Sequence, residues 1–203
     1  MSESLNQNFN HLKVHTQYSI CEGAAKIDDL QEYCKSNKIK SLGISDTSNL
    51  CGALEFAEKI SKSGTQPIIG TQINFKLNDT TGLLPLFALN ETGYKNIIEL
   101  SSNSYLENDE LSDPHVNFDE LLKSSDGVSV FSGTVLGLFG KLFDKGKFTE
   151  INEIYSKIKE VFGDRFYLEI QRHNDTNENG FEKFNLKKSA ELEIPIIATN
   201  EVF

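Results

Sequence analysis

Several polar side chains that can bind metals or transfer protons follow the apolar runs of the sequence, where predicted strands end. They are His15, Asp46, Gln72, Ser132, Thr134, His173 and Glu201. In β/α architectures the carboxyl ends of the strands present such residues to one common mouth. Imidazole and carboxylate groups gathered there can hold divalent cations that activate water and polarise a phosphate. A single polar residue at a strand end is more often structural, so the whole set is more informative than any member.

The histidines limit how many metal ligands this mouth can offer, because the chain has four of them. His115 lies in a predicted acidic loop, where we expect it to be solvated. His11 lies inside the first predicted strand, where a packed or hydrogen-bonded imidazole is more common than a ligand. His15 and His173 remain as candidate ligands. A phosphoesterase centre with two or three metals needs more donors than these two.

Other chemical motifs are absent or weak. The sequence contains neither a GxxxxGK[ST] phosphate loop nor a GxSxG nucleophile elbow. Three glycines near a predicted helix start are interpreted as turn and packing residues: Gly133, Gly137 and Gly140. The three cysteines lack a CxxC spacing, which predicts reduced, buried thiols rather than a disulfide framework or a zinc site. They are Cys21, Cys34 and Cys51.

The elements that must position these residues alternate along the chain. β-branched and apolar runs predict seven strands, at 8–14, 39–45, 67–75, 83–89, 127–132, 165–171 and 194–200. Helical spacing predicts three apolar faces: Ile27, Leu30 and Cys34; Leu50, Leu54, Ala57 and Ile60; and Ile151, Ile154, Tyr155, Ile158 and Phe162, closed by Gly163. Further helices are predicted at 92–106 and 180–192, and surface loops at 107–117 and 172–179.

These elements predict an α/β fold. Strands such as SLGIS and IPIIAT are nearly continuous in apolar residues, which suits a parallel sheet covered on both faces. Right-handed crossovers then favour a barrel or a doubly wound sheet. We expect a β/α barrel of about seven strands that forms one domain over residues 1–203.

Composition limits the partners of the chain. Its 203 residues are 38% hydrophobic and 25% charged, which is ordinary for one globular domain. A formal net charge of −10 leaves no basic stripe for a phosphate backbone, so we expect no unaided grip on nucleic acid. Neither a secretory signal nor a membrane span is visible, which predicts a cytoplasmic protein. The apolar final segment, IPIIATNEVF, predicts that the natural chain continues.

Several segments together resemble one family. They are FNHLKVHTQYSICEGAAKIDDL, ISDTSNLCGALEF, PIIGTQ, TGYKNIIELSSNSY, DRFYLEIQ and IPIIATNE, in this order. The segments resemble the amino-terminal PHP (polymerase and histidinol phosphatase) domain of bacterial DNA polymerase III alpha subunits, along essentially the whole chain. The resemblance implies a seven-stranded β/α barrel whose ancestral form binds three divalent metals and hydrolyses phosphoesters. In some alpha subunits the domain resembles a second, zinc-dependent proofreading exonuclease.

The sequence departs from the family's ligand pattern at most of the positions that the resemblance assigns. The expected HxH pair is Lys13 and His15, the acidic residue before glycine is Glu22, and the histidine after Asp46 is replaced by Thr47. The expected strand-three glutamate is Gln72, the expected cysteine is Thr134, and the final DxH pair is Glu201 and Phe203. His15, Glu22 and Glu201 remain as vestigial candidate ligands, with Asp46 and His173 as polar neighbours, and one family ligand stays unplaced. An ammonium opposes metal binding and a threonine is a poor ligand for zinc or manganese, so we expect no metal.

The resemblance therefore implies a non-catalytic structural and docking module. It would steady the rest of the polymerase alpha chain and seat the separate proofreading exonuclease (epsilon) subunit. The full-length chain would be a DNA-directed DNA polymerase that uses Mg²⁺ and contacts DNA through segments beyond Phe203. One alternative is a residual phosphoesterase, pyrophosphatase or 3′–5′ exonuclease that works with Zn²⁺ or Mn²⁺ through His15, Glu22 and Glu201. Another is a domain that only stabilises the rest of the chain and has no partner of its own.

Overall fold

The computed structural model describes residues 9–108 and 112–203. The elements in chain order are β1 (Lys13–Val14), α1 (Ile27–Asn37), β2 (Ser41–Thr47), α2 (Ala53–Lys62), β3 (Gln66–Leu77), β4 (Thr80–Ala88), α3 (Glu91–Leu106), β5 (Val116–Asn117), α4 (Phe118–Lys123), β6 (Val128–Phe131), α5 (Leu138–Asp144), α6 (Phe148–Phe162), a 3-10 turn (Gly163–Arg165), β7 (Phe166–Ile170), α7 (Glu178–Leu192), β8 (Ile196–Ala198) and β9 (Glu201–Val202). Within this part of the chain no helix has the length and apolar character needed to cross a membrane.

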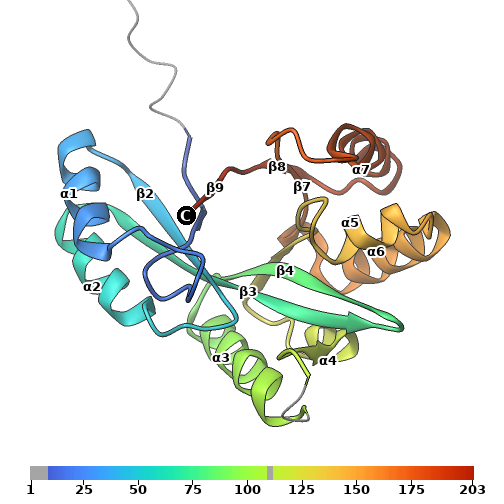
Figure 1. Ribbon diagram of the computed structural model, residues 1–203, viewed down its shortest axis with the longest axis horizontal. Coiled ribbons are helices and arrows are strands. Elements are labelled where there is room, and N and C mark those ends of the chain that lie inside the picture. Colours follow the sequence, from blue (N-terminus) through green and yellow to red (C-terminus); the bar gives the residue numbers. More distant parts are fainter. Residues whose placement is uncertain (1–8, 109–111) are drawn as a thin grey trace, which may run out of the picture.

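The predicted α/β class is confirmed. Six of the predicted strands belong to a seven-stranded sheet that β5 completes, whereas the first predicted strand lies in a separate sheet. Strands follow the order β2-β3-β4-β6-β7-β8, and β5 pairs with β3. The sheet curls into half a barrel with helices around it, and the end of the chain returns to β1 near the centre of the view (Figure 1). There β9 pairs in parallel with β1 as a separate two-stranded sheet. The ends of β1 and β9 therefore lie side by side.

The sheet is mixed rather than wholly parallel. β3 pairs antiparallel with β4, and β4 pairs antiparallel with β6, whereas the β2–β3, β6–β7 and β7–β8 pairs are parallel. A two-residue turn at Asn78 and Asp79 joins β3 to β4, and Asn78 has a φ of 52°. Such a short connection can only reverse the chain, because a parallel partner needs a crossover of about a dozen residues.

The first predicted strand is much shorter than expected. Residue 8 of the predicted strand lies outside the described residues, and within residues 9–14 only Lys13 and Val14 form a regular strand. His11 lies before this strand, edge-on to the ring of Phe9. The preceding segment still lies against β2, because the Gly43 N–H donates to the carbonyl of His11. A Cβ atom at Gly43 would come within 2.3 Å of the Leu12 carbonyl oxygen. A glycine is therefore required for this close approach.

The helix predictions hold for α1, α3, α6 and α7 and are wrong in register for α2. On α6, Ile151, Tyr155, Ile158 and Phe162 are buried and Gly163 caps the helix as predicted. α2 begins at Ala53 and buries Ala53, Phe56 and Ile60, whereas Leu54 is 71% exposed and Leu50 precedes the helix. The helix α4 was not predicted, and α5 begins at Leu138, close to the helix start predicted near Gly137. Of the predicted loops, 107–117 ends in β5 and lies partly outside the described residues, and 172–179 ends in the first turn of α7.

Two hydrophobic cores hold the helices against the sheet. The larger lies under α3 to α7 and the smaller, which includes Ile27, Ile44 and Phe56, lies under α1 and α2. Cys34 is buried in the smaller core, as predicted. The same prediction is wrong for Cys21 and Cys51, which are exposed because they lie in loops; all three thiols are free.

Candidate functional site

A cavity of about 150 Å³ opens where the ends of β1, β2, β3 and β9 meet the loop after β6. Its lining brings together seven of the residues singled out in the sequence: His15, Glu22, Thr47, Gln72, Thr134, Glu201 and Phe203. These residues are up to 188 positions apart in the chain (15 to 203). The curled sheet gathers them at one mouth, as expected for strand ends in this architecture.

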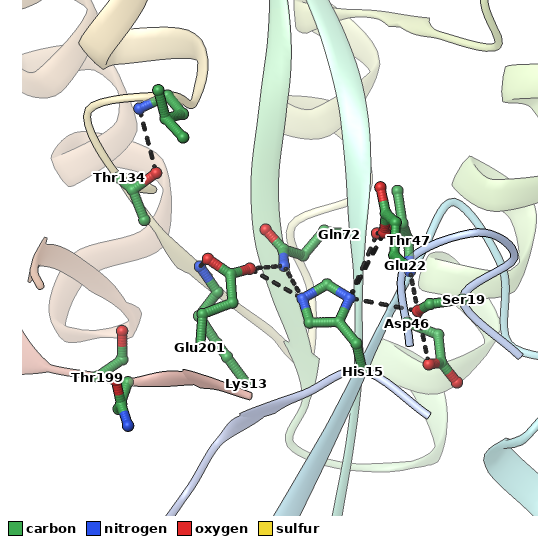
Figure 2. Close-up of polar contacts among 12 residues, drawn as sticks. Lys13, His15, Ser19, Glu22, Asp46, Thr47, Gln72, Thr134, Thr199 and Glu201 are labelled. Carbon is green, nitrogen blue, oxygen red and sulfur yellow. Dashed lines mark hydrogen bonds and ion pairs between the residues drawn. The ribbon is translucent and has the colours of Figure 1, made fainter. Parts of the chain in front are cut away.

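His15 lies at the centre of the site, between two groups of oxygen atoms (Figure 2). Its Nε2 atom lies 2.8 Å from Oε1 of Glu201, and its Nδ1 atom lies 3.2 Å from the Ser19 hydroxyl. The Phe203 ring stacks on the imidazole at 4.5 Å between centroids. Both ring nitrogens therefore have partners, and either could ligate a metal only by giving up one of these contacts.

Lys13 lies two residues before His15 and is 1% exposed. Its Nζ atom is 3.2 Å from Oε1 of Glu169 and 3.3 Å from Oε2 of Glu201. Burial of a charge is unfavourable unless opposite charges compensate it, and here two carboxylates flank one ammonium. The ammonium thus supplies, from a covalently attached side chain, the positive charge that two converging carboxylates require.

Glu169 was not identified from the sequence as a site residue. It lies on β7, is 2% exposed, and also accepts hydrogen bonds from Gln171 Nε2 at 3.1 Å and from the Thr199 hydroxyl. Its Oε2 atom has no hydrogen-bond partner in the described part of the chain. A charged residue inside the apolar strand FYLEI was the available signal, because carboxylates are rarely buried without a partner.

Glu201 remains ionised over a wide pH range. Burial alone would raise its pKa, but the hydrogen bond with His15, the charge of Lys13 and the Gln72 amide together lower the pKa to about 2. The Nε2 atom of Gln72 donates to Oε1 of Glu201 at 2.5 Å and also lies 2.9 Å from His15 Nε2. Gln72 therefore presents an N–H donor to its neighbours here, where a metal ligand would present a lone pair.

Glu22 and Thr47 form the more open side of the cavity. The Thr47 hydroxyl donates to Oε2 of Glu22 at 2.5 Å, and that carboxylate lies 3.8 Å from His15 Nδ1. The side chain of Glu22 is 42% exposed. Glu22 therefore remains solvated at the rim, whereas Glu201 lies deeper.

Asp46 and His173 do not line the cavity, contrary to their expected place at the mouth. The Asp46 carboxylate accepts hydrogen bonds from the Thr16 N–H, the Thr16 hydroxyl and the Ser19 hydroxyl, and so fixes the loop after β1. His173 is exposed, and its Nε2 atom lies 2.8 Å from the Asn200 side-chain oxygen. Both residues were expected at the mouth because each follows a strand, but their side chains turn to local partners.

Thr134 lines the cavity but stands apart from His15 (Figure 2). Its hydroxyl accepts a hydrogen bond from the Leu136 N–H at 3.2 Å, in the loop before α5. The hydroxyl therefore shapes its own turn. Ser132, which precedes this loop, is buried and accepts from the Glu169 N–H at 2.9 Å.

The donors of this site do not fit a divalent metal centre. Metal ligation needs several converging lone pairs, but Lys13 and Gln72 present N–H donors to the same carboxylate. Within residues 9–108 and 112–203, no three His, Cys, Asp or Glu side chains are arranged to hold a metal ion. A metal would have to displace Lys13 from the buried carboxylate of Glu169 and the partly buried carboxylate of Glu201. We therefore assign no catalytic step to a metal at this site.

Residues 11–173 match the family described as PHP domain. The chain belongs to the PHP domain family. This match covers β1 to β7, including Lys13, His15, Glu22 and Gln72. Lys13, Thr47, Gln72 and Thr134 lie within the matched residues, whereas Glu201 and Phe203 lie beyond them.

Curated relatives of this PHP domain are named DNA polymerase III subunit alpha. The protein from Caulobacter vibrioides is 35% identical over 216 residues, which cover 100% of this chain and 18% of that protein. The one from Rickettsia felis is 36% identical over 195 residues, 96% of this chain and 16% of that protein. The one from Borreliella burgdorferi is 35% identical over 209 residues, 98% and 18% respectively. The chain thus spans less than a fifth of the length of these relatives.

Two solved structures share the fold of this PHP domain at low sequence identity. A protein named as a metal-dependent phosphoesterase, from Bifidobacterium adolescentis, gives a TM-score of 0.52 at 14% identity and covers 95% of this chain and 87% of its own. An amidohydrolase from Chromobacterium violaceum, described with bound sulfate and no metal, gives 0.60 at 9% identity with the same coverage. At these identities the likeness extends to the fold alone.

Proposed function

We propose that this PHP domain is a structural and docking module of a replicative polymerase alpha subunit, and that it works without bound metal. The observation that carries the proposal is the position of Lys13, whose ammonium lies within 3.3 Å of carboxylate oxygens from both Glu169 and Glu201. A resident cation of this kind repels an incoming metal ion. The half-barrel and its strand ends then persist without the chemistry of a metal-bound hydroxide.

The placement in a polymerase is supported by relatives that match the chain along its whole length. In the complete protein, templated phosphoryl transfer would use Mg²⁺ held by carboxylates outside this segment, and contact with DNA would be made through those other parts. The net charge of −10 favours DNA contact through other parts of the protein, because an acidic domain gains nothing from the release of counterions from DNA. We therefore expect no nucleotide incorporation by the 203-residue chain on a primed template.

The docking part of the proposal concerns a proofreading exonuclease subunit. An acidic exterior suits a protein partner better than nucleic acid, because complementary charge can steer the encounter. Co-purification of the tagged chain with the co-expressed exonuclease subunit tests this part. Failure of the two to associate at micromolar concentration would leave a domain that only stabilises the rest of its own chain.

The metal-free part is tested by metal analysis and by turnover. We expect chelator-free protein to contain far less than one equivalent of zinc or manganese by plasma mass spectrometry. We also expect no hydrolysis of p-nitrophenyl phosphate or of a single-stranded oligonucleotide when either metal is added. Stoichiometric metal together with turnover that is lost in a His15→Ala variant would overturn the proposal and establish a metal-dependent phosphoesterase.

A further inference from the structure

A groove of about 510 Å³ lies between α6 and α7, on the helical side of the molecule and separate from the strand-end cavity. None of its lining residues lines the cavity around His15. In Figure 1 the helices α5, α6 and α7 lie together on the right of the view, with the two-stranded sheet β1–β9 between them and α1. The groove is therefore a second surface, distinct from the candidate site.

The floor and walls of the groove are aromatic. Phe143, Phe148 and Phe184 contact one another pairwise, with ring centroids 5.3 to 5.8 Å apart. Phe148 is 48% exposed, although the first turn of a helix could carry a polar residue there. Aromatic rings are among the side chains most enriched at protein interfaces, where an apolar side chain of the partner fills the space between them.

The rim of the groove is basic. Lys187 and Lys188 share one carboxylate, Glu191, at 3.6 Å and 2.6 Å from the respective Nζ atoms. Two ammonium groups on one carboxylate leave an excess positive charge, in a chain whose formal net charge is −10. The side chain of Lys187 is 71% exposed. A ligand with carboxylates beside its apolar group is complementary to this rim.

Two polar side chains on α6 add hydrogen-bonding capacity to the same groove. Thr149 and Asn152 line it and lie three residues apart, which places them on one face of the helix. Neither the Thr149 hydroxyl nor the Asn152 amide makes a side-chain hydrogen bond among the described residues. An extended peptide presents backbone N–H and C=O groups that such side chains can pair with.

We propose that this groove binds a short acidic segment of a partner protein, with one large apolar side chain among the three phenylalanine rings and a carboxylate beside Lys187. The inference rests on the proposed docking function, for which it names a surface and a ligand chemistry. A second copy of this chain is the competing occupant. The excess positive charge of the rim favours the acidic segment.

The test uses a fluorescein-labelled octapeptide with Leu-Phe-Leu flanked by aspartates and measures anisotropy with the 203-residue chain. We expect saturable binding that weakens by about tenfold or more in Lys187→Glu and in Phe148→Ser, as for central anchor residues. Lys95→Glu is the matched control, because Lys95 is 70% exposed and forms an i,i+4 pair with Glu91, as Lys187 does with Glu191. This control should bind as the wild type does, and a peptide with asparagine for aspartate should bind weakly.

Equal binding by Lys187→Glu and wild type, or absence of saturation at millimolar protein, would overturn the inference. So would a wild-type dimer in analytical ultracentrifugation that Phe148→Ser dissociates, because a second copy would then be the occupant. Co-purification with the exonuclease subunit separates this inference from the proposed function. If Lys187→Glu and Phe148→Ser retain that subunit as the wild type does, docking stands and only the groove assignment fails.

Discussion

Replacement of Lys13 by methionine removes the ammonium that lies between the buried Glu169 and the partly buried Glu201 while preserving most of the side-chain volume. Each of the Nζ–carboxylate contacts, at 3.2 Å and 3.3 Å, corresponds to about 5 kcal/mol of attraction at an effective dielectric constant of about 20. Much of this is offset by the removal of a desolvated ammonium. Breaking a buried ion pair from one side costs about 3–5 kcal/mol overall. We therefore expect Lys13→Met to lower the free energy of unfolding by about 4 kcal/mol.

Urea unfolding at pH 7, followed by circular dichroism, measures this loss directly. For a chain of this length about 2–4 °C of melting temperature accompanies each kcal/mol, so a fall of roughly 10 °C is expected as well.

Adding Glu169→Gln to Lys13→Met should recover part of the loss, because it removes one uncompensated charge. The matched surface control, Lys95→Met, should change stability by less than about 1 kcal/mol. A Lys13→Met variant within about 1 kcal/mol of wild type would refute the reasoning.

Three further predictions concern the cavity and the loop after β1 that lies beside it. The pKa of Glu201 is about 2 instead of 4.5. Its ionised carboxylate therefore stabilises the fold above about pH 4.5, and this stabilisation is lost as the pH falls toward 2. The Glu201→Gln variant should lack this contribution of about 3 kcal/mol in acid unfolding. Asp46→Asn weakens three hydrogen bonds to Thr16 and Ser19 and should lower the unfolding free energy by about 2–3 kcal/mol, with faster amide exchange in the loop after β1. Adding 1 mM Zn²⁺ or Mn²⁺ to chelator-treated wild type should shift the melting temperature by less than about 1 °C, because a site that binds no metal gains nothing by mass action.

Local sequence patterns predicted those elements whose burial follows one clear period. The spacing of Ile151, Tyr155, Ile158 and Phe162 indicated α6 and its buried face, and Gly163 marked its end. α2 was misjudged because Leu50 and Leu54 fit a helical period equally well. The choice between registers was made by tertiary packing, which buries Phe56 and leaves Leu54 exposed. Periodicity cannot distinguish two registers of similar apolar content.

The sequence predicted which residues belong to the site, but not which of them contact one another. The resemblance named His15, Glu22, Gln72 and Glu201, and the fold does bring them to one cavity. The pairing of Lys13 with Glu169 joins residues 156 positions apart (13 to 169). Such a contact depends on which strand ends meet after the sheet curls. The spacing of residues along the sequence does not predict which strand ends will meet.

The ion pairs of Lys13 with Glu169 and Glu201 also link separate parts of the fold. Lys13 and Glu201 belong to the two-stranded sheet β1–β9, whereas Glu169 belongs to β7 of the seven-stranded sheet. The ammonium therefore bridges two sheets that share no ladder of hydrogen bonds. A metal ion held by donors from the same strands would also bridge them, but its contribution to stability would vary with metal concentration. A lysine is covalently attached, so its contribution is independent of metal supply. Lys13 thus provides a structural link between the two sheets that needs no bound cation.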